Sequence, residues 1–283
     1  MTISIASRFE QLEELPTIPA SLSRVLKEID KESSTADSLE KVIRDDPVFT
    51  AKLLRMANSS FYGVSGKVNS IARAVMVLGF KEVRNLVIAL SLSDTFSENL
   101  GFDQFDSYKI WLHSIVTGRA SQLLSSHIPA LDPDEMFTAG VIHDLGRVLM
   151  CLFFKEEMEE ILALHQKEGL PLHVAEQRYG LFHGDVGSYI TVMWGFSDML
   201  STVVQCHHDP QKAGPHTVAA SVVFLAEGLS KKLGLFWHEE DAKENLFLPK
   251  CLGLDGGAVK KIAAQLKNEK DQIIEAWGNV VSS

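Results

Sequence analysis

Apolar residues recur every three or four positions along most of the chain. This spacing places them on one face of an α-helix, whereas a half-buried strand would show apolar and polar residues in alternation. No stretch of the sequence shows such an alternation convincingly. The pattern therefore predicts an all-α protein.

The first hundred residues contain predicted helices with recognisable ends. One helix begins at Pro19, and Asp46-Pro47 separates two more. Ser70 begins a further helix, Gly79 ends it, and another helix follows directly. Ser and Asp are favoured at helix starts because their side chains accept hydrogen bonds from the first unpaired backbone N–H groups.

The two helices around Gly79 allow two interpretations. They can form an ordinary helical hairpin within a bundle, or a helix-turn-helix motif that reads DNA. The second helix offers only three side chains that could contact bases, Lys81, Arg84 and Asn85. We therefore favour the hairpin.

Residues 99–106 read as a linker, which divides the chain into three parts. Residues 1–100 form a predicted N-terminal helical bundle, residues 101–235 a second helical domain, and residues 236–283 a C-terminal helical extension. A long helix is predicted from about 104 to 126, and a helix that starts at Asp132-Pro133 runs on through 143 and 144. The remaining predicted helices cover 155–168, a segment from 171, 197–208, 216 or 217 to 233, and 255–277.

The charge distribution sets the second part of the chain apart. The net charge is −10, and residues 101–235 hold 9 basic and 16 acidic groups together with nine of the ten histidines. Bound divalent cations would offset this negative charge locally. Nonspecific nucleic-acid binding needs a basic surface, so we do not expect a nucleic-acid partner.

Cysteine usage and hydropathy bear on the compartment. Cys151, Cys206 and Cys251 are odd in number and widely spaced, which is typical of a reducing cytoplasm and not of a disulfide framework or a cysteine zinc cage. The sequence has no run of about 18 apolar residues and no charged-then-apolar leader. We therefore expect a cytoplasmic protein without a membrane span.

The apolar run TAGVIHDLGRVL, residues 138–149, is broken by the adjacent pair His143 and Asp144. Neighbouring side chains on a helix point about 100° apart, yet both can touch one ion, or the carboxylate can bridge two. Imidazole nitrogen with carboxylate oxygen suits iron, zinc, manganese or nickel. The pair alone is equally well explained as a buried hydrogen-bonded pair. The metal hypothesis rests on a series of candidates, each on or at the end of a separate predicted helix: His113, His143 with Asp144, His183, His207 with His208, and Glu227.

Each candidate also has a plain structural interpretation. His113 can be a core histidine, His183 can cap a helix, and Glu227 can be a salt-bridge partner. Of His207 and His208, one can face solvent or orient its neighbour. The other histidines are interpreted as surface or structural residues: His127, His165, His173, His216 and His238.

Several longer motifs go together with these candidates. The first half carries LPTIPASLSRVL, IRDDPVFTAKLLRMANSSFYG and SIARAVMVLGFKEVRNLV, and the second half carries WLHS, AGVIHDLGRVL, FHGDVGSYI, CHHDP and FLAEGLS. With them, roughly residues 12–235 resemble the HDOD branch of the HD superfamily of metal-dependent phosphohydrolases. The resemblance implies an N-terminal helical bundle packed on an HD-type metal-binding helical bundle.

The resemblance also implies a centre of two divalent ions that Asp144 bridges. A water between two such ions would be a nucleophile, because divalent metals depress its pKa. In an active enzyme Arg147, three residues after Asp144, would contact the substrate phosphate. The other implied ligands are His113, His143 and Glu227 for the first ion and His183, His207 and His208 for the second.

Three positions depart from the related enzymes. Glu227 stands where the family usually has Asp, and it is longer by one methylene group. Residues 207–216 read HHDPQKAGPH and lack the Gly-Tyr-Pro signature of the cyclic-dinucleotide phosphodiesterases, so we reject that specificity. Lys109 stands where that branch can place a carboxylate, one turn before the first histidine.

Two functions agree with these features. The first is a signal-transduction module whose metal centre is structural or binds a small phosphorylated ligand, and whose N-terminal bundle passes the state to a signalling protein. The second is an active phosphohydrolase or phosphodiesterase that acts on a nucleotide-like substrate. We favour the first, because no substrate motif surrounds the site. Iron is the favoured metal, with manganese, zinc and nickel as alternatives.

Overall fold

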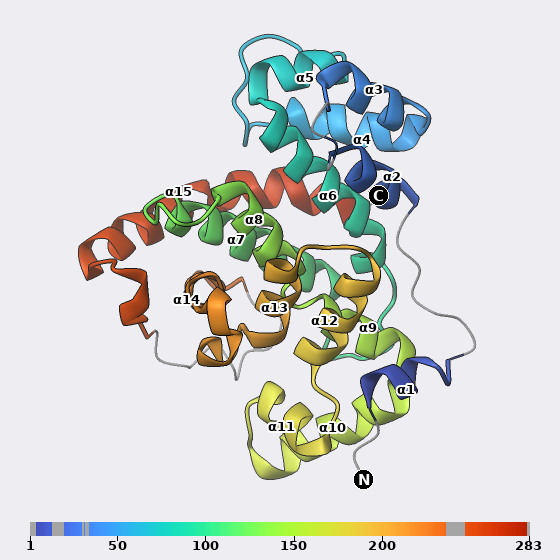
Figure 1. The fold of residues 1–283 in the computed structure, drawn as a ribbon, viewed down its shortest axis with the longest axis vertical. Coiled ribbons are helices and arrows are strands. Elements are labelled where there is room, and N and C mark those ends of the chain that lie inside the picture. The colour runs from blue at the N-terminus through green and yellow to red at the C-terminus, as the bar shows by residue number, and fades with distance from the viewer. Residues whose placement is uncertain (1–3, 13–19, 30, 32–33, 236–246, 282–283) are drawn as a thin grey trace.

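The computed structural model describes residues 4–12, 20–29, 31, 34–235 and 247–281. These residues form α-helices and short 3-10 helices and no strand, which confirms the predicted all-α class. The predicted helix start at Pro19 and the interpretation of His238 lie outside the described residues. The helices form an upper and a lower group in Figure 1, and helix α6 runs from one to the other.

The upper group is the N-terminal bundle. Asp46 and Ser70 accept hydrogen bonds from the backbone N–H groups of Phe49 (2.9 Å) and Arg73 (3.1 Å), so both predicted helix starts are confirmed. Gly79 ends the next helix at φ +88°, a conformation that favours glycine. The helices of this group are α2 (Ala20–Ile29), α3 (Ala36–Arg44), α4 (Pro47–Ala57), α5 (Ile71–Leu78) and α6 (Phe80–Phe96).

Two of the three side chains that a helix-turn-helix would use to read DNA are occupied within the protein. Lys81 pairs with Asp132 at 2.8 Å, and the Asn85 amide donates to Asp134 at 3.0 Å. Both partners lie at the start of α8, so these contacts join α6 to the lower group. The structure therefore favours the hairpin interpretation.

The lower group surrounds helix α7, which is buried along most of its length. Gly118 and Gly140 allow α7 and α8 to touch, since a Cβ atom on Gly140 would lie 2.6 Å from the Gly118 Cα. Two short 3-10 helices, Pro210–His216 and Lys250–Leu252, connect helices of this group. Its α-helices are α7 (Ser107–Ser125), α8 (Pro133–Ile142), α9 (Leu145–Phe153), α10 (Lys155–Glu168), α11 (Leu172–Tyr179), α12 (His183–Met193), α13 (Asp198–Cys206) and α14 (Thr217–Lys232). The first helix of the chain, α1 (Ile5–Phe9), also belongs to this group and contacts α12.

The structure corrects the prediction of one helix through residues 143 and 144. Helix α8 ends at Ile142, Asp144 leaves helical geometry at φ −99° and ψ 9°, and α9 begins at Leu145. The combined segment Pro133–Phe153 is apolar enough to cross a membrane by length and composition, but 89% of its tested window is buried inside the protein. The pair of helices is thus a core element, interrupted where the two polar side chains lie.

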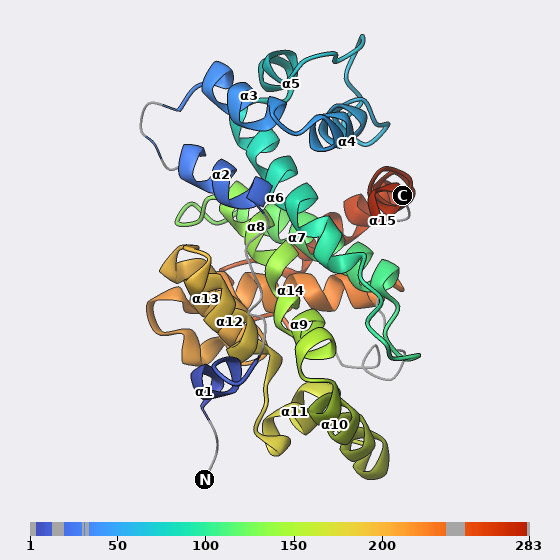
Figure 2. The same ribbon diagram turned by 90° about the vertical axis from the view of Figure 1, so that its right-hand side faces the viewer.

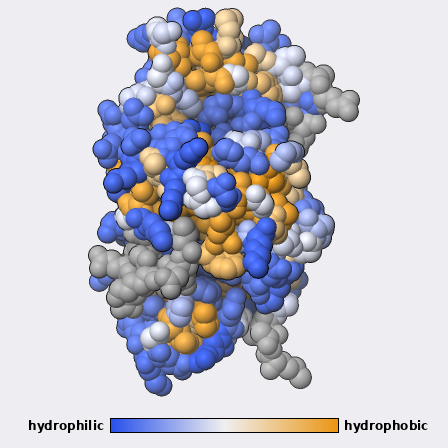
Figure 3. All heavy atoms as spheres, turned by 90° about the vertical axis from the view of Figure 1, so that its left-hand side faces the viewer, coloured by the Kyte–Doolittle hydropathy of each residue, from blue (hydrophilic) through white to orange (hydrophobic). Residues whose placement is uncertain are grey.

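Helix α15 (Gly256–Val281) joins the two groups. It lies along α7, where Arg119 forms an ion pair with Glu269 at 2.8 Å and the Trp111 indole donates to the Trp277 backbone carbonyl at 2.9 Å. Its C-terminal part lies beside α4 of the upper group. On the face in Figure 3, apolar side chains gather in an upper and a middle area with a hydrophilic band between them.

Candidate metal centre

Helices of the lower group bring the seven candidate ligands to one region. The side chains come from segments up to 114 positions apart in sequence, so only the packing of these helices assembles them. Six of the seven are buried, and the seventh, His208, is partly exposed. Their positions are His113 in α7, His143 and Asp144 between α8 and α9, His183 at the start of α12, His207 and His208 after α13, and Glu227 in α14.

The ligand atoms form three overlapping groups, and within each group they lie within 4.8 Å of one another. Imidazole nitrogens and carboxylate oxygens of this kind suit a transition metal. The groups are Asp144 with His183, His207 and His208; His113 with His143 and Asp144; and His143 with His207 and Glu227.

The two carboxylate oxygens of Asp144 face different histidines. Oδ1 lies 3.4 Å from His183 Nε2 and 3.9 Å from His207 Nε2, whereas Oδ2 lies 3.5 Å from His143 Nε2. A carboxylate arranged in this way can serve two ions, one at each oxygen.

Backbone hydrogen bonds fix the orientation of two imidazoles. His143 Nδ1 lies 2.7 Å from the Gly140 carbonyl, and His207 Nδ1 lies 2.8 Å from the Val204 carbonyl. A carbonyl oxygen only accepts, so each Nδ1 carries the proton. In a neutral ring the lone pair is then on Nε2, which faces the centre.

Among the candidate ligand atoms, His183 Nε2 and His207 Nε2 make the shortest contact, at 3.2 Å. His183 Nδ1 contacts a Glu176 carboxylate oxygen at short range, which places the proton on Nδ1 and the lone pair on Nε2. Two lone pairs at this distance repel unless a proton or a cation lies between them. Nitrogen ligands of one ion, each about 2.1 Å from it, lie about 3.0 to 3.4 Å apart. The pair therefore fits a shared metal ion.

Three further atoms support the same interpretation. His143 Nε2, Asp144 Oδ2 and His208 Nε2 are buried without a hydrogen-bond partner among the described residues. Leaving such an atom unsatisfied costs about 1–3 kcal/mol, and more for a charged group. Coordination to a metal ion would satisfy all three atoms, so the donor set fits the metal that the sequence implies.

Burial and charge keep these groups in the protonation states that a metal ligand needs. Burial lowers the pKa of His113 to about 4 and that of His207 to about 3, and it holds the pKa of His208 well below its ordinary value. Burial raises the pKa of the Asp144 carboxyl, but Arg147 and the nearby histidines lower it by more. The imidazoles of His113, His207 and His208 are therefore neutral, and the Asp144 carboxylate is ionised, at neutral pH.

Arg147 points into the centre and is held by two carboxylates. Its Nη1 donates to Asp144 Oδ1 at 2.8 Å and its Nε donates to Glu176 Oε1 at 3.1 Å, while its Nη2 lies beside the His183 ring. Glu176 also accepts from the His183 backbone N–H at 3.2 Å. Because the guanidinium is 3% exposed and used in this way, it orients the ligands around it.

Helix α11 covers one side of the centre. It supplies Glu176, which is fully buried, and His173, whose ring stacks on His208 at 4.2 Å between centroids with an interplanar angle of 6°. A cavity of about 530 Å³ lies beyond this side and has Phe182 and Cys206 in its wall. The partly exposed His208 is thus shielded by a neighbouring aromatic ring.

Glu227 lies near His143 and His207 and has a cationic partner. Lys231, one helical turn later in α14, pairs with its Oε1 at 2.9 Å, and both side chains are buried. Burial raises the pKa of Glu227, but Lys231 and His207 lower it by more, and the carboxyl is ionised. Glu227 therefore forms a salt bridge with Lys231. A carboxylate oxygen of Glu227 also lies within 4.8 Å of ligand nitrogens of His143 and His207.

Comparison with known proteins places the chain in a family. The family model of the HDOD domain matches residues 15–210, more than half of the chain. The chain belongs to the HDOD domain family. This confirms the resemblance found in the sequence motifs. The chain spans 36–44% of the length of the curated relatives that it matches.

Solved structures share the fold over nearly the whole chain. An HDOD domain protein of unknown function from Geobacter sulfurreducens is 23% identical, covering 98% of this chain and 96% of its own, with a TM-score of 0.80. A candidate signal transduction protein from Marinobacter aquaeolei is 24% identical, covering 99% of this chain and 64% of its own, at 0.81. A candidate phosphohydrolase from Shewanella amazonensis is 23% identical, covering 98% of each chain, at 0.74. These similarities show the HDOD fold.

Sequence reasoning missed two residues of this HDOD centre, Glu176 and Lys231. The stacking of His173 on His208 agrees with the structural role that the sequence allows for His173. Glu176 had a detectable signal, because it lies next to Ala175 on the apolar face of α11 in a position where a charge requires a partner. Lys231 follows Glu227 by four residues, the spacing of a helical ion pair.

Proposed function

We propose that this HDOD protein is a regulatory signal-transduction module with a metal centre in its lower bundle. The contact between His183 Nε2 and His207 Nε2 supports the metal centre in this proposal, because two buried lone pairs face each other there. The name of the Marinobacter relative, a candidate signal transduction protein, supports the regulatory role. A signalling protein that contacts the N-terminal bundle is the proposed partner.

The ligands of the centre divide into two sets around Asp144. When bound, divalent metal ions at such a site supply Lewis-acid activation of water or phosphate. Iron is the metal we propose first, because mixed nitrogen and oxygen ligands suit it, and the three free cysteines agree with the reducing cytoplasm that we propose as the location. The first set is His113, His143 and Glu227, and the second is His183, His207 and His208.

Arg147 favours regulation over catalysis. Substrate phosphate would need its guanidinium, but two donors of that group already bind the carboxylates of Asp144 and Glu176. Binding of phosphate to Arg147 would leave the buried carboxylates of Asp144 and Glu176 without their cationic partner. A small phosphorylated ligand at the centre would therefore have to displace these contacts.

Elemental analysis of protein purified without chelator tests the metal centre. We expect at least one transition-metal ion per chain, and a loss of most of it in His143→Ala, because one Nε2 donor disappears. His127→Ala removes an exposed histidine and serves as the matched control. A metal content below one per chain in the unmodified protein would exclude the centre described here.

The alternative function is a working phosphohydrolase, and the full set of seven ligands favours it. Metal-loaded protein is incubated with a panel of nucleotides and cyclic nucleotides, and phosphate or nucleoside release is measured. Turnover that disappears in His143→Ala and persists in His127→Ala would establish the enzyme. Absence of turnover in metal-loaded protein is the result that the regulatory proposal expects.

A further inference from the structure

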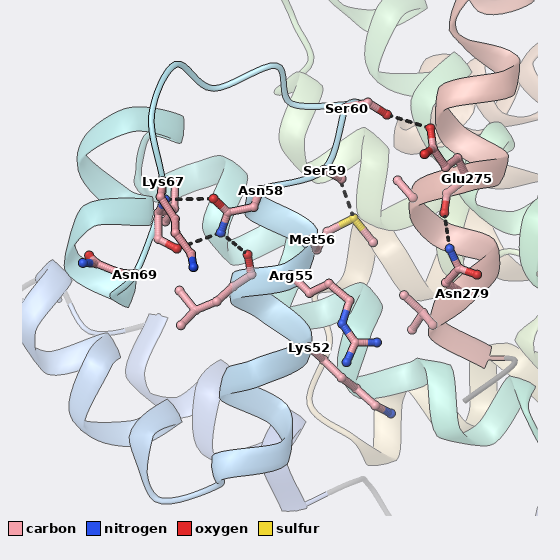
Figure 4. A pocket seen from close by; sticks show the side chains of 14 residues that line it. Lys52, Arg55, Met56, Asn58, Ser59, Ser60, Lys67, Asn69, Glu275 and Asn279 are labelled. Atoms are coloured by element: carbon pink, nitrogen blue, oxygen red, sulfur yellow. Dashed lines mark hydrogen bonds between the residues drawn. The ribbon is translucent and has the colours of Figure 1, made fainter.

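A groove on the surface joins the N-terminal bundle to the C-terminal helix. It is a cavity of about 660 Å³ between α4, the loop after α4 and the last turns of α15 (Figure 4). A second cavity of about 590 Å³ continues it past Pro47 and Val48, and both cavities have Lys52, Arg55 and Val280 in their walls. Together they form one elongated groove, which we call the α4–α15 groove.

Internal hydrogen bonds hold the walls of the α4–α15 groove in place. The Asn58 side-chain amide donates to the carbonyls of Leu54 and Val68, both at 2.7 Å, and accepts from the Val68 backbone N–H at 2.8 Å. Ser60 donates to Glu275 of α15 at 3.0 Å, which ties the loop to the opposite wall. These polar groups serve the protein itself, so the groove is formed before any partner binds.

Apart from these hydrogen-bonded groups, the groove has an apolar lining and two cationic side chains at its edge. Val68 and Met56 are buried beneath it, and Val48 at its far end is 69% exposed. The side chains of Arg55 and Lys67 are exposed and form no ion pair or hydrogen bond within the described part of the chain. Of the other charged groups in the walls, Lys52 pairs with Asp94 at 2.9 Å, and Glu275 accepts from Ser60. Arg55 and Lys67 are therefore the cations available to a partner beside the apolar surface.

We propose that the α4–α15 groove docks an acidic, amphipathic segment of a partner protein. Apolar side chains of that segment would cover Val48 and the lining, while its carboxylates would pair with Arg55 and Lys67. A small anion suits the groove less well, because the two free cations are exposed at its edge and no buried polar group points into it from the described residues. The proposal supplies a contact surface for the signalling role and rests on that role.

Selection of peptides from a random display library tests the groove directly. The bait is the full chain, and the library displays peptides of about 16 residues, which span about 24 Å as a helix. We expect selected peptides to combine Asp or Glu with large apolar residues. The double variant Arg55→Glu/Lys67→Glu should weaken their binding at least about tenfold, because each change turns attraction into repulsion.

The matched control changes the same charges elsewhere on the N-terminal bundle. Lys41 and Arg44 of α3 are exposed, so Lys41→Glu/Arg44→Glu alters net charge equally and should leave peptide binding within about twofold. Thermal unfolding of both double variants verifies that they fold. Selection of no peptide, of peptides without acidic residues, or of peptides that bind both double variants equally would overturn the proposal.

Inorganic pyrophosphate separates the protein partner from a small anion. Saturable binding of pyrophosphate that depends on Arg55 and competes with the peptides would identify a small-anion site and overturn the docking proposal. Metal content is measured on the same protein. Loss of peptide binding without loss of metal, or the reverse, therefore separates the groove from the metal centre.

Discussion

At the scale of single residues, one carboxylate oxygen has competing partners. Asp144 Oδ1 accepts from Arg147 at 2.8 Å and also faces His183 and His207, where an ion would bind. Glu176 binds the same guanidinium and the Nδ1 of His183. It therefore balances the charge of Arg147 and makes His183 a better ligand through one side chain.

Substitution Glu176→Gln should weaken metal binding about 10- to 100-fold. The amide keeps the size of the side chain but loses the charge that orients His183 and balances Arg147. Competition with a chromophoric chelator measures the affinity. Glu168→Gln removes a carboxylate from the more exposed ion pair with Arg178 and is the control. Equal affinities in the two variants would show that Glu176 does not position the ligands.

At the scale of elements, the centre depends on the crossing of α9 and α12. A Cβ atom on Gly146 would lie 1.9 Å from the His183 carbonyl oxygen and 2.5 Å from the Gly187 backbone nitrogen. Backbone atoms cannot move aside as flexible side chains can. Glycine at 146 therefore brings the start of α12, with His183, next to the junction that carries Asp144.

Substitution Gly146→Ala should lower the free energy of unfolding by about 1–3 kcal/mol and displace His183 from the centre. Gly256→Ala is the control, because a Cβ at the first residue of α15 has no neighbour within 4 Å. Denaturant unfolding measures stability, and chelator competition measures the metal affinity of the folded variant. A stable Gly146→Ala protein with unchanged metal affinity would contradict this account of the crossing.

Local sequence signals predicted the helix ends well but could not reveal this crossing. Asp132 and Ser197 were identifiable as caps, because a capping side chain acts within three residues. The break at Asp144 was missed, because the apolar pattern continues across it. No helix was predicted over 183–193, where Gly184 and Gly187 obscure the apolar pattern. Close neighbours of these two glycines include Gln205 and Val204, which belong to a different helix. The candidate ligands could be named from the sequence, but their partner Glu176 required the fold.

At the scale of the whole molecule, two long helices connect the metal centre to the N-terminal bundle. Helix α6 begins in the upper group and contacts α7 and α8, and α15 lies along α7 and reaches α4. Through Lys81 and Asp132, the start of α8 is bound to α6, and α8 ends beside the centre. A structural change at the metal centre can therefore reach the α4–α15 groove through helices that pack against one another.

Metal loading should stabilise both groups of helices as one unit. An ion at about 100 times its dissociation constant adds about 2.7 kcal/mol to the free energy of unfolding, which for a chain of 283 residues raises Tm by roughly 4 to 5 °C. Differential scanning calorimetry of chelated and reloaded protein should show a single transition that moves upward. His127→Ala should retain the shift and His143→Ala should lose it. Two transitions, of which only one responds to metal, would show that the N-terminal bundle does not sense the centre, and the proposed signalling route would fail even if the metal binds.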